Sequence, residues 1–240
     1  MVGGNIIQVS AKNWGHDLGA MAVAVTEKTK IIFVTNPNNP TGTWNTKAQL
    51  ETFLNSVPEH VIVLLDEAYF EYVDKADYPN GIDYLKQYPN LVVTRTFSKA
   101  YGLASLRVGY GVSSPELADL MNRVRPPFNV DSFALAAAKA CVLDEAYVRQ
   151  SKELNDEGML QLQSGFDQLN ISWIPSVGNF ICLEVPEHVN AMNVYQGLLQ
   201  RGVIVRPVAN YEMPNYLRVS IGTQKENEIF LLKLKEILAR

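Results

Sequence analysis

The stretch that decides the fold is residues 31–42, IIFVTNPNNPTG, in which an apolar run is followed at once by a polar, proline-rich turn. The same order recurs twice: the apolar run 61–65 precedes Asp66-Glu-Ala-Tyr69, and the run 91–96 precedes Ser98-Lys99. The runs are largely continuous in their apolar character, which predicts strands covered on both faces by helices. Each polar cluster then lies at the carboxyl edge of a parallel sheet, where such folds bind ligands.

Helical segments alternate with these runs up to about residue 125, and this alternation predicts a parallel α/β sheet. We expect strands at 30–35, 61–65 and 91–96, and helices at 47–56 and 115–124. Thr46 with Gln49 forms a capping box, and Ser114 precedes a proline at the first helical position, so both helices begin with clear signals. Residues 2–9 are expected to form a turn that feeds a further strand.

The character of the chain changes after Arg125-Pro-Pro-Phe128. Segments with alternating helical and strand character follow: helices at 131–143, 145–169 and 191–201, strands at 179–184, 203–206 and 216–221, and a last helix capped by Thr223 and Glu226. The helix at 145–169 is long enough to link two domains. We therefore expect a mostly parallel α/β large domain at 1–144, followed by a linking helix and a smaller α+β domain at 145–240.

The composition excludes several classes of protein. The chain has 240 residues, 47% of them hydrophobic, and its apolar runs fall far short of the ~20 residues of a membrane helix. A net charge of −4 without a long basic run is not typical of nucleic-acid binding. The three histidines lack metal-ligand spacing, so no metal site is predicted. Cys141 and Cys182 are predicted to be buried, reduced thiols, and the chain is predicted to be cytoplasmic with small molecules as partners.

The polar clusters bring together an unusual set of side chains: Asn39, Asp66, Tyr69, Ser98, Lys99 and, eight residues later, Arg107. This set suits pyridoxal 5′-phosphate (PLP), an electron sink that needs a lysine for a Schiff base and a carboxylate for its pyridinium nitrogen. Asp66 would keep that nitrogen protonated. Lys99, once released by the substrate amine, would move the proton as general acid and base.

Longer segments carry a resemblance to a known family. The segments 36–42, 66–69 and 95–110 (RTFSKAYGLASLRVGY) resemble those of fold-type-I, PLP-dependent aminotransferases, and among them the histidinol-phosphate aminotransferase family. Later segments of that family match in the right order at 125–130, 178–180, 202–207 and 217–223. The resemblance implies a fold-type-I PLP-dependent transferase that acts as a homodimer in histidine biosynthesis.

The resemblance also implies individual roles. Asn39 and Tyr69 would donate hydrogen bonds to the 3′-oxygen of PLP, Ser98 and Arg107 would bind its phosphate, and Lys99 would form the Schiff base. Asp66, directly after the second predicted strand, would pair with the ring nitrogen. These roles follow from the family and not from the spacing of the residues.

Two further arginines are implied to bind the substrates. Arg218, with Arg206 as a helper, would hold the phosphate of histidinol phosphate or imidazole-acetol phosphate, and the carboxylate of glutamate or 2-oxoglutarate. The forked guanidinium suits both anions. Either arginine could instead be a structural ion-pair partner, and Tyr69 could be an ordinary half-buried aromatic.

Other functions remain open at this stage. Related folds with the same aspartate, lysine and arginine transaminate aromatic amino acids or decarboxylate threonine phosphate. The apolar run before Asp66-Glu67 also resembles a phosphate-loop nucleotidase, but the glycine-rich loop with Gly-Lys-Ser/Thr is absent from the sequence. A third hypothesis is an inactive fragment that serves only as a dimerisation module.

Family members carry a further segment before the point that matches residue 1. We expect that segment to supply backbone amides to the cofactor phosphate, an aromatic side chain over the pyridine ring and a tyrosine across the dimer interface. Each lost hydrogen bond to a charged phosphate is worth about 1.5–3 kcal/mol. We therefore expect this chain alone to hold PLP weakly.

Overall fold

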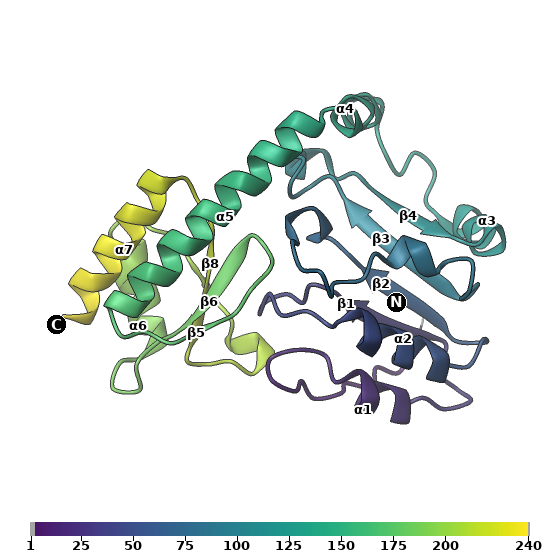
Figure 1. Cartoon of the computed structure of the whole chain (residues 1–240), viewed down its shortest axis with the longest axis horizontal. Coiled ribbons are helices and arrows are strands. Elements are labelled where there is room, and N and C mark those ends of the chain that lie inside the picture. The colour runs from purple at the N-terminus through teal and green to yellow at the C-terminus, as the bar shows by residue number, and fades with distance from the viewer. Residues whose placement is uncertain (1–2, 240) are drawn as a thin grey trace.

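The computed structural model describes residues 3–239 and contains two sheets, and a long helix runs diagonally past both of them (Figure 1). The first sheet has the order β1-β2-β3-β4, with bounds Ile31–Thr35, Ile62–Asp66, Leu91–Thr96 and Gly109–Ser113. The first three strands are parallel, and β4 is antiparallel to β3. The mostly parallel sheet is thus confirmed, and the antiparallel edge strand was not predicted.

The register of the parallel strands aligns their carboxyl ends. Thr35 of β1 lies beside Asp66 of β2, which lies beside Thr94 of β3. The polar residues that follow each strand therefore start from one edge of the sheet, as expected from the three apolar runs.

Helices α1 (Leu18–Val23) and α2 (Lys47–Ser56) pack on one face of this sheet. Val34, Val63 and Leu65 are fully buried in that core. The prediction that helices cover both faces is wrong at β1, where Ile31 and Phe33 are 48% and 62% exposed. The burial of β1 alternates because, within residues 3–239, its second face is left open to solvent.

The boundaries of several helices match their sequence signals. Capping boxes begin α2 and α7 (Gln224–Leu238), and Ser114 caps α3 (Pro115–Val124). The other helices are α4 (Ser132–Val142), α5 (Glu145–Gln168) and α6 (Ala191–Leu199), and short 3-10 helices lie at Phe70–Tyr72, Gly81–Tyr84, Ala104–Leu106 and Ala209–Tyr211. The strand expected within residues 2–9 does not form at residues 3–9.

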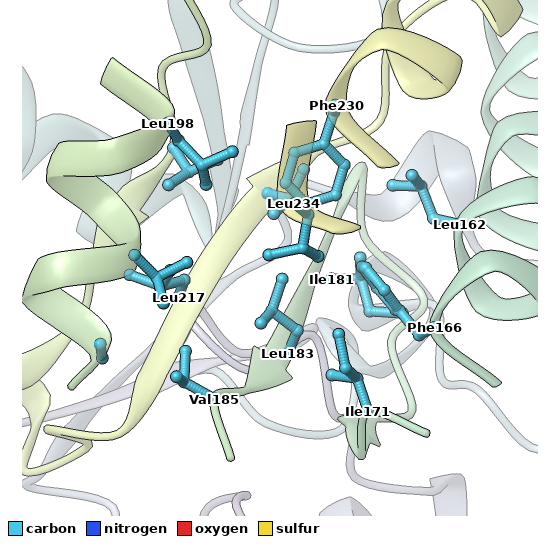
Figure 2. Close-up of a cluster of buried hydrophobic side chains, with 14 of the residues drawn as sticks. Leu162, Phe166, Ile171, Ile181, Leu183, Val185, Leu198, Leu217, Phe230 and Leu234 are labelled. Carbon is cyan, nitrogen blue, oxygen red and sulfur yellow. The ribbon is translucent and has the colours of Figure 1, made fainter. Parts of the chain in front are cut away.

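The second sheet is antiparallel throughout and has the order β5-β6-β8-β7, with bounds Trp173–Ile174, Phe180–Glu184, Tyr216–Ser220 and Arg206–Pro207. Its core lies under α5, α6 and α7 (Figure 2). Phe166 of α5 and Phe230 of α7 meet edge to face there, with ring centroids 6.1 Å apart. We propose residues 1–144 and 145–240 as two domains, because each range holds a sheet and a core of its own.

The structure also bears on the predictions about the cysteines and about membrane helices. Both cysteines are unpaired; Cys182 is buried, and Cys141 is only half-buried. No helix within residues 3–239 is both long and apolar enough to cross a membrane.

Candidate functional site

The loop 36–42 lies between the two sheets and is held at both ends. The buried Asn36 side chain donates to the carbonyl of Asn45 (3.1 Å) and accepts from its backbone N–H (2.8 Å), which closes the loop. Contacts with the second sheet fix the other side: the Cys182 thiol donates to the carbonyl of Pro40 at 3.0 Å. Gly42 has a φ of +77°, and a Cβ there would overlap the Ser176 side chain. These contacts hold the loop close against the segment that contains Ser176 and Cys182.

Asn39, at the centre of this loop, connects the two sheets through its amide. Its Nδ2 donates to the Tyr69 hydroxyl at 3.4 Å, and its Oδ1 accepts a hydrogen bond from the Arg218 guanidinium. Phe180 of β6 completes the group, with its ring 5.1 Å from the Tyr69 ring and 4.9 Å from the Arg218 guanidinium. One amide thus orients a phenol from the first sheet and a cation from the second.

Lys99 follows β3 and lies against the same tyrosine, with Nζ 5.3 Å from the centroid of the Tyr69 ring. Burial lowers the pKa of Lys99, the positive charges of Arg218 and Arg107 lower it further, and Asp66 partly opposes them. A lowered pKa increases the fraction of neutral amine, which is the form that attacks a carbonyl carbon. The site therefore favours Lys99 as a nucleophile.

Asp66 ends β2 beside Lys99. Burial raises the pKa of its carboxyl, whereas the backbone N–H of Ala68, the side chain of Thr94 and the charge of Lys99 favour the carboxylate. The Ala68 N–H donates to Asp66 Oδ1 at 3.0 Å, which fixes the orientation of the side chain. The sequence analysis missed Thr94, and no clear signal marked it, because Arg95 and Thr96 are also polar and follow it in the same run.

Ser98 and Arg107 form a separate pair at one side of Lys99. Arg107 Nη1 donates to Ser98 Oγ at 3.3 Å and to the carbonyl of Ala104 at 2.6 Å. Arg107 is exposed and has a φ of +51°, in the left-handed region, at the end of a 3-10 helix. A hydroxyl and a guanidinium held together at the surface can bind a phosphate group.

The last predicted site residue is Arg206, on β7. It lies directly opposite Arg218 in the β7–β8 register, so the two side chains share a face of the second sheet. Its side chain is exposed. The structure therefore brings Asn39, Tyr69 and Arg218 into contact and leaves Arg206 at the margin.

The donor set fits PLP in its chemistry. The Lys99 amine lies near the Asp66 carboxylate, and the Tyr69 phenol is hydrogen-bonded to the Asn39 amide. The Ser98 hydroxyl and the Arg107 guanidinium together can bind a phosphate. Lys99, Asp66 and Tyr69 come from two neighbouring strand ends, so their convergence follows from the parallel register. Within residues 3–239 there is no cluster of three or more His, Cys, Asp or Glu side chains that could hold a metal ion.

Comparison with known proteins identifies the family of the chain. The sequence model of the family "Aminotransferase class I and II" matches residues 1–234. The chain belongs to this family. It is 59% identical over 239 residues to histidinol-phosphate aminotransferase 2 of Pseudomonas fluorescens strain Pf0-1, covering 100% of the chain and 64% of the relative. The chain thus spans about 64% of the length of that relative.

Two further comparisons support the same family. The chain is 58% identical over 231 residues to histidinol-phosphate aminotransferase 2 of Pseudomonas aeruginosa PAO1, covering 96% of the chain and 62% of that protein. The crystal structure of histidinol-phosphate aminotransferase from Sinorhizobium meliloti in complex with pyridoxal-5′-phosphate matches with a TM-score of 0.90 at 28% identity, covering 99% of the chain and 65% of that structure. The fold-type-I prediction is thereby confirmed for this aminotransferase chain.

Proposed function

We propose that this chain is the larger part of a PLP-dependent histidinol-phosphate aminotransferase, which transfers an amino group between glutamate and imidazole-acetol phosphate. The observation that carries the proposal is the convergence of Lys99, Asp66 and the Tyr69–Asn39–Arg218 group at one sheet edge. The high identity to proteins named histidinol-phosphate aminotransferase supports the choice of substrate.

Different side chains of the site would bind the cofactor and move the proton. When bound, PLP accepts the electron pair that is released as the substrate α-carbon loses its proton. Asp66 holds the ring nitrogen in its protonated form, and Tyr69 with Asn39 holds the 3′-oxygen. Lys99 would attach the cofactor through Nζ, and once the substrate amine takes its place, the same Nζ would be free to accept and hold the substrate α-proton.

The cations are assigned to the anionic groups. Ser98 and Arg107 bind the phosphate of PLP, and Arg218, assisted by Arg206, binds the carboxylate of glutamate or the phosphate of histidinol phosphate. Arg218 already has one oxygen acceptor in Asn39, which orients the guanidinium and leaves its other N–H groups for the substrate. One oriented fork can serve both substrates of a two-step exchange.

A homodimer is part of the proposal. Its support is an apolar surface on and around α3 and α4, where Val124, Phe128, Phe133 and Leu143 are each 80% exposed or more. Monomers rarely leave so many large apolar side chains in water, and such patches mark interfaces. We also propose a cytoplasmic location, because both cysteines are unpaired thiols, the usual state in a reducing compartment.

PLP binding is the first test. We would titrate PLP into the 240-residue chain, and into the same chain joined to the part of the Pseudomonas fluorescens relative that it does not span. The visible absorption of lysine-bound PLP should appear and should be lost in Lys99→Ala but kept in the control Lys86→Ala, an exposed lysine. No band in either wild-type protein would contradict the cofactor assignment.

Substrate preference is the second test. Turnover with histidinol phosphate should exceed turnover with phenylalanine or threonine phosphate, and a preference for either of the latter would favour an aromatic aminotransferase or a threonine-phosphate decarboxylase instead. A defined oligomer with no PLP binding and no turnover, even in the extended protein, would favour the dimerisation module. Sedimentation of the same samples would measure that oligomer.

A further inference from the structure

Behind Asp66 and Tyr69 lies a buried ion pair to which the proposed function assigns no role. Glu67 is fully buried and directly follows Asp66. Its Oε2 accepts from Arg95 Nη2 at 2.7 Å and from Arg95 Nε at 3.0 Å, and its Oε1 accepts from the backbone N–H of Gly81 at 2.7 Å. Both oxygens of this carboxylate are therefore satisfied away from the site.

Arg95 is held equally firmly on its own side. Its guanidinium lies 3.5 Å from the centroid of the Phe70 ring, and its Nη2 also donates to Asn80 Oδ1 at 2.7 Å. The arginine side chain is only 9% exposed. Phe70 directly follows Tyr69, just as Glu67 directly follows Asp66. Arg95 therefore contacts the chain neighbour of each of these two site residues.

The backbone of this segment adds two hydrogen bonds. The N–H of Glu67 donates to the carbonyl of Thr94 at 2.9 Å, and the N–H of Phe70 donates to the carbonyl of Glu67 at 3.0 Å. The turn that carries Asp66 and Tyr69 is thus anchored to β3 at its beginning and folded back on itself at its end. The ion pair fixes the remaining freedom, the position of the turn relative to β3.

We infer that the Glu67–Arg95 pair is a positioning device that holds Asp66 against the ring nitrogen of PLP and Tyr69 against its 3′-oxygen. The inference rests on the proposed function. Glu67 and Arg95 bond to each other, to Gly81 and to Asn80, so both act on the site through their neighbours in the chain.

The choice of a charged pair supports positioning over stability. A buried ion pair seldom stabilises more than apolar side chains of the same volume, because both charges lose their hydration. Two hydrogen bonds from Arg95 to one oxygen of Glu67 do impose one geometry, which apolar contacts do not. Glu71 lies close enough for the charge of Arg95 to act on its carboxyl, and its buried Oε2 has no hydrogen-bond partner. That oxygen gives Arg95 a second carboxylate to approach when Glu67 is changed.

The test compares two variants of the pair with two controls. Glu67→Gln keeps the shape and the acceptor for Gly81, whereas Arg95→Lys keeps the charge and loses the fork and the Phe70 contact. Val194→Ala, fully buried in the core of the second sheet, controls for lost stability. Asp119→Asn controls for loss of an ion pair, because Asp119 pairs with Arg123 on the exposed surface of α3.

The test uses the extended protein, in which the chain is joined to the part of the Pseudomonas fluorescens relative that it does not span. Each variant of the pair should weaken PLP binding about tenfold there. This is the lower end of the loss in metal affinity or activity caused by replacing residues that support metal ligands. The pH midpoint of the lysine-bound PLP band should also shift, because a displaced Asp66 no longer keeps the ring nitrogen protonated and the charge on the ring acts on the imine. Both controls should leave the dissociation constant and the midpoint unchanged. If Glu67→Gln only lowers the unfolding temperature, as Val194→Ala does, the inference is wrong.

A second readout does not need the cofactor. Hydrogen–deuterium exchange of residues 66–73 without PLP should be faster in Glu67→Gln and Arg95→Lys than in the wild type, and unchanged in Val194→Ala and Asp119→Asn. Failure of the wild type to bind PLP would contradict the proposed function alone. Unchanged exchange in both variants of the pair would overturn the positioning role, whatever PLP does.

Discussion

Replacing Asn39 should separate the two halves of the site. In Asn39→Ala, the Arg218 guanidinium loses its acceptor on the loop, and the Tyr69 hydroxyl loses its donor. A hydrogen bond to a charged group contributes about 1.5–3 kcal/mol, and a long neutral one about 0.5 kcal/mol. Arg218 is only half-buried, so water replaces part of the loss, and we expect a net effect of about 2 kcal/mol.

The expected loss corresponds to roughly a thirtyfold decrease in kcat/KM. It should appear with both glutamate and histidinol phosphate, because the same arginine is proposed to bind both. Steady-state kinetics in the extended protein would measure it. Asn39→Asp provides the matched variant: it keeps an oxygen for Arg218, but its charge competes with anionic substrates, so KM should rise for both. A KM that stays at the wild-type value for both substrates in both variants would refute the assignment of Arg218.

Three other predictions concern the scaffold and the titration of the site. Leu234→Ala should lower the free energy of unfolding by about 2–5 kcal/mol in chemical denaturation, because the side chain is fully buried in the second core; an effect below 1 kcal/mol would contradict that packing. Gly42→Ala should destabilise the chain, and Ser176→Gly in the same protein should restore part of the loss by removing the overlap; equal stability of the single and double variants would count against it. Arg218→Met should raise the pKa of Lys99, so labelling of this amine by an amine-reactive reagent, followed by mass spectrometry, should shift to higher pH; a shift to lower pH would reverse the assigned electrostatics.

The sequence was informative where local chemistry decides the structure. The helix at 115–124 has the predicted bounds because Ser114 and Pro115 leave little choice of starting residue, and the capping box at Thr46 fixes α2 in the same way. The convergence at the sheet edge was also predictable, since three apolar runs followed by polar clusters imply parallel strands whose carboxyl ends align.

Other features depend on contacts that no local pattern reveals. The strand β4 contains Gly109 and Gly111, which weaken a strand signal, and its pairing depends on β3. The hydrogen bond between Asn39 and Arg218 joins residues 179 positions apart, so only the packing of the second sheet on the loop shows it. Glu67 stood within a recognised motif, yet its partner Arg95 is 28 residues away, and the pair became visible only in the folded chain.

The central claim is that the Lys99 amine holds the cofactor. The most direct measurement is reduction of the PLP-loaded protein with borohydride, which fixes the cofactor to its lysine, followed by peptide mass spectrometry. We predict that the modification lies on Lys99 alone and disappears when PLP is omitted. A label distributed over surface lysines, or one concentrated on a different lysine, would contradict the account.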